Sequence, residues 1–115
     1  MRRGECGAAV PSRGMGPKRL RRLEVHTDDA GTRVFVARSF RARLLGLTLL
    51  EDIPRHWALL LPGCTSVHTF GMRFCLEVRF LDERSEVLRR ESGVPPRRVL
   101  CCPGAAAVLE WRSEG

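Results

Sequence analysis

A chain of 115 residues is long enough for one domain with a single modest core. The net charge of +7 is concentrated near the start, since residues 1–23 hold seven basic groups and one acidic group. The five cysteines include no Cys-x-x-Cys pair and no apolar run reaches membrane-spanning length, which argues against a disulfide framework, a zinc ribbon and a membrane span.

The first 19 residues are predicted to form a disordered basic tail because they are rich in Arg, Gly and Pro. Residues 20–112 are predicted to form a single domain. A basic tail can bind nucleic acid or another acidic partner, but the domain has no basic stripe and no recognised nucleic-acid motif, so we do not favour this role. The odd cysteine count and the lack of a secretory signal favour a reduced, cytoplasmic location.

The first half of the domain is predicted to contain a hairpin and a short helix. Residues 20–26 have the pattern of a strand with Leu23 and Val25 inward, and a turn at residues 28–31 leads to a second strand at residues 34–36. Ser39 has the side chain of a helix N-cap, and apolar residues follow it at helical spacing: Phe40, Leu44 and Leu47.

The second half is predicted to consist of strands. Residues 57–61 form a short apolar run, and residues 74–81 alternate with a period of two, which is typical of a strand with one buried face. A turn at residues 82–85 precedes further strands at residues 86–90, 98–102 and 105–111. We expect Trp57 and Trp111 in the core, and Ala107 and Leu109 on the same face as Trp111. Six or seven short strands and one helix predict a mainly β fold, either a compact β-sandwich or an open barrel.

The segment from Cys64 to Arg73 is predicted to be a polar turn that the following strand holds in place. The candidate ligand-binding residues are the hydrogen-bonding and charged side chains of this segment, together with one carboxylate on the strand: Ser66, His68, Thr69, Arg73 and Glu77. On the strand, Glu77 and Arg79 are predicted to share one face. Phe70 and Met72 are expected to fill the core.

Catalysis and metal binding are alternatives for the same segment. His68 has the side chain of a general base, with Cys64 as nucleophile and Glu77 as the orienting group, although a turn histidine and a buried free cysteine are the more common outcomes. A metal site would need three or four converging ligands, and Cys64, His68 and Glu77 show no recognised ligand spacing. We therefore predict no metal and identify no cofactor.

Three ordered blocks resemble a known family, domain of unknown function 192 (DUF192). The blocks are residues 37–47, residues 66–74 with 78–82, and residues 94–98 with 104–110. The Ser-Val-His-Thr-Phe-Gly-Met run at residues 66–72 is similar to one branch of that family. The resemblance implies a compact, mostly β domain and supplies no activity. Where the family typically has Asp, this chain has Glu77, which is one methylene longer.

Three functions remain as hypotheses. We favour a non-catalytic binding or accessory protein with a polar ligand or partner site at Cys64–Arg73. The first alternative is a small hydrolase-like or transferase-like enzyme that uses His68 with Cys64 or Glu77. The second is docking of nucleic acid or an acidic partner through the basic tail. The sequence names neither a ligand nor an oligomeric state.

Overall fold

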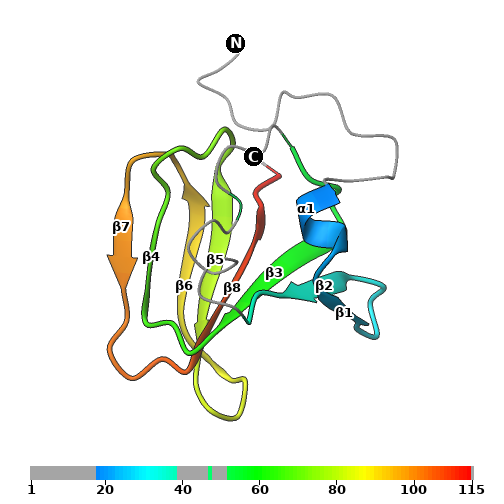
Figure 1. Ribbon diagram of the computed structural model, residues 1–115. Helices are drawn as coiled ribbons and strands as arrows, with labels where there is room; N and C mark the ends of the chain where they lie inside the picture. Colours follow the sequence, from blue (N-terminus) through cyan, green and yellow to red (C-terminus); the bar gives the residue numbers. More distant parts are fainter. Residues whose placement is uncertain (1–17, 39–46, 48–51, 115) are drawn as a thin grey trace.

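The computed structural model describes residues 18–38, 47 and 52–114, and every structural statement below concerns these residues. They form one short helix and eight strands (Figure 1). In chain order these are α1 (Lys18–Arg21), β1 (Glu24–Thr27), β2 (Arg33–Val36), β3 (Trp57–Pro62), β4 (Ser66–His68), β5 (Leu76–Leu81), β6 (Val87–Val94), β7 (Val99–Cys101) and β8 (Ala107–Arg112). The prediction of a mainly β fold is confirmed.

The strands form two sheets. The large sheet has the order β1-β2-β3-β8-β5-β6, in which β2 and β3 are parallel and all other neighbours are antiparallel. The small sheet pairs β4 with β7. Figure 1 shows the small sheet beside the β6 end of the large one, and the Arg89 guanidinium of β6 donates a hydrogen bond of 2.6 Å to the Cys101 carbonyl of β7. The large sheet is open, with β1 and β6 at its edges, rather than closed into a barrel.

The core lies on one face of the large sheet, where it includes Leu20 of α1, Leu47 and Ile53 and is also contacted by the small sheet. The predicted alternation along β5 is confirmed, because Leu76, Val78 and Phe80 are fully buried. The pairing register places the inward residues of β3 and β8 on the same face, as expected when residues directly opposite each other in a ladder point to one side. From the small sheet, the paired residues Val67 and Leu100 pack against this core.

The amino-terminal prediction is wrong in two details. Residues 18–21 are helical, and the first strand begins only at Glu24. Leu20 is buried in the core, whereas Val25, which was expected to point inward, is 46% exposed. The physical reason is that β1 is an edge strand whose four residues are all exposed, so neither of its faces is covered. The predicted helix after Ser39 lies outside the described residues, apart from Leu47, which is buried.

The closing strand β8 buries the face opposite to the one expected. Trp111 is only half-buried, and the Arg79 guanidinium lies 4.8 Å from the centroid of its ring. The core-facing residues of β8 are instead Val108, Glu110 and Arg112, all below 9% exposure. The expectation for Trp57 is confirmed, since it is 1% exposed and packs on Phe35 with ring centroids 4.4 Å apart.

The two predicted hairpin turns have the same hydrogen-bond pattern. In one, Asp28 Oδ1 accepts the N–H groups of Ala30 and Thr32, both at 2.9 Å. In the other, Asp82 Oδ1 accepts those of Arg84 and Glu86, at 2.8 and 2.9 Å. The fourth residue of each turn has a positive φ, and it is Gly31 (φ 86°) in the first and Ser85 (φ 65°) in the second. The turns are therefore matched in geometry and differ in sequence.

Candidate functional site

The Cys64–Arg73 segment contains a strand where the sequence predicted only a turn. Residues 66–68 form β4, which pairs with β7 through Ser66 opposite Cys101 and His68 opposite Val99. Ser66 and His68 are exposed, whereas Val67 between them packs against the core. Two of the predicted site residues therefore share the outer face of the small sheet, which faces away from the core.

Thr69 holds the end of this segment in place. Its side chain is fully buried, and Oγ1 donates a hydrogen bond of 2.7 Å to the Pro95 carbonyl and accepts one of 2.8 Å from the Arg98 N–H. Its backbone N–H also donates to the Arg98 carbonyl at 2.9 Å. Buried polar groups with this many partners fix the local backbone. The structure therefore gives Thr69 a supporting position, with no surface for a ligand to contact.

An aromatic side chain stands beside His68 on the surface. Phe70 is 51% exposed, contrary to the expectation of a core position, and its ring centroid lies 6.0 Å from that of His68. Val99, opposite His68 on β7, is 62% exposed. Met72 is buried as predicted, and Arg73 is exposed. The segment thus presents an imidazole, a phenyl ring and a guanidinium to solvent.

Cys64 does not share this surface with His68. Cys64 is half-buried and packs against the hydrophobic core, whereas His68 is exposed on the outer face of the small sheet, so the structure does not bring together the Cys64–His68 pair that the sequence offered as an alternative. Cys101 and Cys102 are free thiols, exposed and half-buried respectively, whereas Cys75 is disulfide-bonded. The sequence argued against disulfide bonds, and Cys75 is the exception to that prediction among the described cysteines.

Glu77 lies on the opposite face of the large sheet. Its neighbours Leu76 and Val78 point into the core, so its carboxylate points to the outer side, where Oε2 accepts the Gly93 N–H at 2.9 Å. Arg79 shares this face as predicted, with Nη2 3.4 Å from Glu77 Oε1. Burial opposes ionisation of Glu77, but the hydrogen bonds and the Arg79 charge outweigh it, so its pKa is lowered. The structure does not bring Glu77 together with His68.

Sequence reasoning missed a buried carboxyl group, Glu110. It is 2% exposed in the core, with Leu59 and Val78 opposite it on the neighbouring strands. Burial raises its pKa to about 8, and among the described residues Oε1 has no hydrogen-bond partner. The indole N–H of Trp57, a core-facing residue of β3, also has no hydrogen-bond partner among the described residues. In the sequence, Glu110 is two residues from Val108 and therefore lies on the same face of β8. This signal was insufficient, because both faces of that strand carry apolar residues and the sequence does not show which one is buried.

A buried ion pair involves Arg112, two residues beyond Glu110 on β8. Arg112 Nε is 2.7 Å from Asp52 Oδ1, and the two side chains are 8% and 7% exposed. Burial raises the pKa of Asp52, while the Ile53 N–H and the charges of Arg112 and Arg55 act in the opposite direction. The pair ties the end of β8 to the chain before β3, and a buried pair of this kind is weak evidence of net stabilisation.

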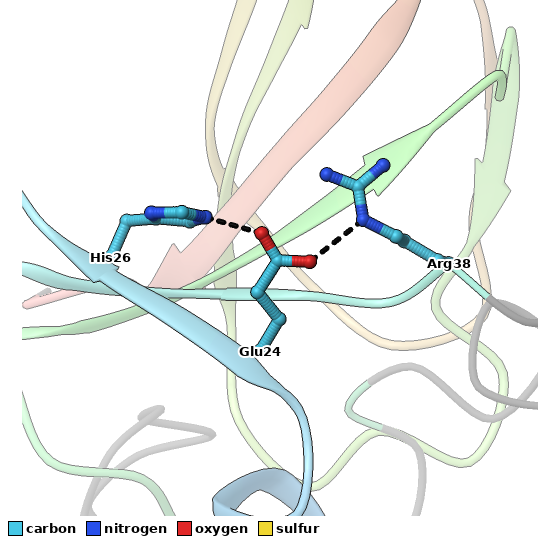
Figure 2. Close-up of polar contacts among 3 residues, drawn as sticks. All are labelled: Glu24, His26 and Arg38. Atoms are coloured by element: carbon cyan, nitrogen blue, oxygen red, sulfur yellow. Dashed lines mark hydrogen bonds and ion pairs between the residues drawn. The ribbon is translucent and has the colours of Figure 1, made fainter.

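A second polar cluster lies on the surface at the first hairpin (Figure 2). Glu24 of β1 accepts a hydrogen bond of 2.8 Å from Arg38 Nε and contacts His26 Nε2 with its other oxygen. These contacts, that of Arg38 first, lower the pKa of Glu24 to about 2. All three side chains are more than 40% exposed, which limits what such an ion pair contributes to stability.

Neither a metal cluster nor a membrane helix is found in the described part of the chain. No group of three or more His, Cys, Asp and Glu side chains there is arranged to hold a metal ion. Of the helical segments that the structure describes, none has the length and apolar character needed to cross a bilayer.

The comparisons with known proteins point to a family and a fold. The family model DUF192, described as "Uncharacterized ACR", matches residues 23–114. A protein of unknown function from Novosphingobium aromaticivorans has a similar structure, with a TM-score of 0.65 and 18% identity over 78% of this chain and 71% of that one. A proposed transcription regulator from Sinorhizobium meliloti matches with a TM-score of 0.65 and 17% identity, over 79% and 78%. At such identities the likeness shows the fold alone, and no curated protein matches the chain.

Proposed function

Because the chain belongs to the DUF192 family of uncharacterised proteins, which supplies a fold and no activity, we propose a function from the surface of the small sheet. The protein is a non-catalytic accessory domain that binds a protein partner through the outer face of β4 and β7. Ser66, His68 and Arg73 supply polar contacts, and Phe70 supplies the apolar one. We also place the chain in the branch with the Ser-Val-His-Thr-Phe-Gly-Met motif; its cytoplasmic location stays a prediction.

The observation that carries the proposal is the exposure of Phe70 and Val99 beside His68. More than half of each apolar side chain faces solvent, at 51% and 62%. Aromatic residues and arginines that project from a surface are enriched where proteins bind partners. Aromatic rings bury a large area at a small loss of side-chain freedom, and a guanidinium supplies several hydrogen-bond donors. An exposed imidazole and hydroxyl on the same face supply directional hydrogen bonds to such a partner.

A fixed backbone supports this surface. The Thr69 hydrogen bonds to residues 95 and 98 hold the segment where it leaves β4, and pairing with β7 holds the strand itself. Binding to a surface that is already ordered avoids the entropy cost of ordering a loop. The arrangement therefore favours recognition by a fixed surface over capture by a mobile loop.

The same geometry gives less support to catalysis. A nucleophile and its base need to lie within hydrogen-bond reach, and Cys64 packs on the core while His68 points outward. Glu77 is on the far side of the large sheet and is occupied by the Gly93 N–H. The function that these positions support best is therefore binding.

The test uses photocrosslinking in the cells that naturally make the protein. Position 70 is replaced by a photoreactive phenylalanine analogue, and the matched control carries the same analogue at position 88 on β6. The two native side chains are almost equally exposed, at 51% for Phe70 and 49% for Leu88, so general stickiness affects both alike. We expect a discrete crosslinked protein from position 70 alone.

A second substitution connects the crosslink with the polar residues. His68→Ala in the position-70 chain should remove most of the crosslinked product while the melting temperature changes little, because the imidazole is exposed and its ring contact is with the side chain at position 70, which is also exposed. Equal products from positions 70 and 88, or a product that persists after His68→Ala, would contradict the proposed surface.

A further inference from the structure

A cleft lies on the outer face of the large sheet, on the side away from β4 and β7. Its volume is about 280 Å³, and its apolar lining comes from three adjacent strands: Val34, Trp57, Ala58, Leu109 and Trp111. Ala58 stands between Val34 on one side and, by the register of β3 with β8, Trp111 on the other. A methyl group between two larger side chains leaves a hollow in the face of the sheet. The cleft thus follows from a small residue at the centre of a row.

Two charged groups of opposite sign border this hollow. Asp28 and Arg55 both line the cleft and are both exposed. Asp28 uses Oδ1 for its turn, and no described residue bonds to Oδ2. Arg55 and Asp28 form no ion pair within 4 Å among the described residues, so they do not neutralise each other. The charge of Arg55 also acts on the buried Asp52 carboxylate, whose pKa it lowers against the larger effect of burial. An apolar floor with one exposed anion and one exposed cation at its margin is complementary to a ligand that carries both charges on an apolar body.

The size of the cleft limits that ligand. Pockets for drug-sized molecules occupy about 300–1,000 Å³, and this cleft lies just below that range. We propose that it binds a small zwitterion of the chemistry of an apolar α-amino acid. The ligand ammonium pairs with the Asp28 carboxylate, the ligand carboxylate pairs with the Arg55 guanidinium, and the apolar side chain rests on Ala58 and Trp111.

The test is a titration of the ¹⁵N-labelled full chain with L-phenylalanine to millimolar concentration, followed by NMR. We expect saturable shifts of the amides of Val34 and Ala58 and of the Trp111 indole. N-acetyl-L-phenylalanine lacks the ammonium and L-phenylalanine amide lacks the carboxylate, so each should bind at least about tenfold more weakly, since each loses a charge-assisted hydrogen bond.

Two charge variants test the assigned contacts. Asp28→Asn retains the Oδ1 acceptor of the turn and removes only the charge, and Arg55→Gln removes the cation. Each substitution should lower the affinity for L-phenylalanine about tenfold. Asp28→Asn should not lower the affinity for N-acetyl-L-phenylalanine any further, because that probe has no ammonium group to pair with Asp28. Asp82→Asn is the matched control, because Asp82 makes the same two hydrogen bonds in the other hairpin turn.

Several outcomes would overturn the assignment. One is the absence of any shift in the cleft with L-phenylalanine; another is equal binding of the two capped derivatives, which would show that the charges play no part. A loss of affinity in Asp82→Asn as large as in Asp28→Asn would attribute the effect to the turns. Loss of L-phenylalanine binding in Asp28→Asn and Arg55→Gln, with Asp82→Asn unchanged, is the supporting result.

Discussion

The buried carboxyl group of Glu110 predicts an unusual dependence of stability on pH. Its pKa rises from 4.5 to about 8 in the folded protein because burial disfavours the charged form. Between these values the folded state retains a proton that the unfolded state releases. The free energy of unfolding must therefore fall as the pH rises through this window, and it must level off above about pH 8.

The slope follows from the size of the shift. Each pH unit in the window costs about 1.4 kcal/mol, so the whole shift corresponds to about 5 kcal/mol between pH 4.5 and pH 8. This is a large fraction of the 5–15 kcal/mol that typically separates folded from unfolded states. Glu110→Gln removes the titrating group and should therefore remove this component of the slope.

The assay is urea unfolding of the wild type and of Glu110→Gln at intervals from pH 5 to pH 9. The difference between the two profiles isolates Glu110, because all other titrating groups are common to both proteins. The amide leaves buried N–H donors, so the absolute stability of the variant at pH 5 can be lower; the slope alone carries the test. Glu86→Gln, at an exposed carboxylate, serves as control. Parallel profiles for wild type and Glu110→Gln would refute the reasoning.

Two further predictions concern the buried Thr69 hydroxyl and the backbone conformation of the two hairpin turns. Thr69→Val keeps the shape of the side chain but removes the hydrogen bonds of Oγ1 to residues 95 and 98, so it should lower the free energy of unfolding in urea by about 2 kcal/mol. The control Thr65→Val, at an exposed position, should change that free energy by less than about 0.5 kcal/mol. Equal losses of stability in Thr69→Val and Thr65→Val would contradict the supporting role of the Thr69 side chain. Ser85→Gly should raise stability by about 0.5–1 kcal/mol, because Ser85 adopts φ 65° and only glycine does so without a steric cost. The reciprocal Gly31→Ser, where nothing lies within 4 Å of an added Cβ, should lower it by a similar amount in thermal unfolding, and a change of the opposite sign in either variant would contradict this account.

Local patterns were sufficient to predict most of the strands. The alternation from Phe74 to Leu81 predicted β5 and its buried face, because side-chain direction along a strand repeats every two residues whatever the rest of the chain does. The two turns were likewise readable, since an Asp that accepts hydrogen bonds from its own turn is a local device. Residues 57–61 of β3 were predicted from a short apolar run, which is also a local pattern.

Other features depended on partners distant in sequence. β4 is three residues long and exists because it pairs with β7, more than thirty residues later, so no local period indicated it. Val25 has the residue type of an inward position, yet β1 lies at an edge where no second layer covers it. In β8 both faces carry apolar side chains, and only the position of the sheet against the core decides that Glu110 is buried while Trp111 is half-exposed.

The candidate site shows the same division. Local residue order was enough to predict that hydrogen-bonding residues cluster between Cys64 and Arg73 and that a half-buried strand follows them. The positions of these residues in the folded chain could not be predicted in this way: His68 and Ser66 share one face of the small sheet, Thr69 is enclosed, and Glu77 lies on the far side of the large sheet. The reason is that periodicity fixes which residues share a face of one strand, whereas the stacking of two sheets fixes which of those faces meets solvent.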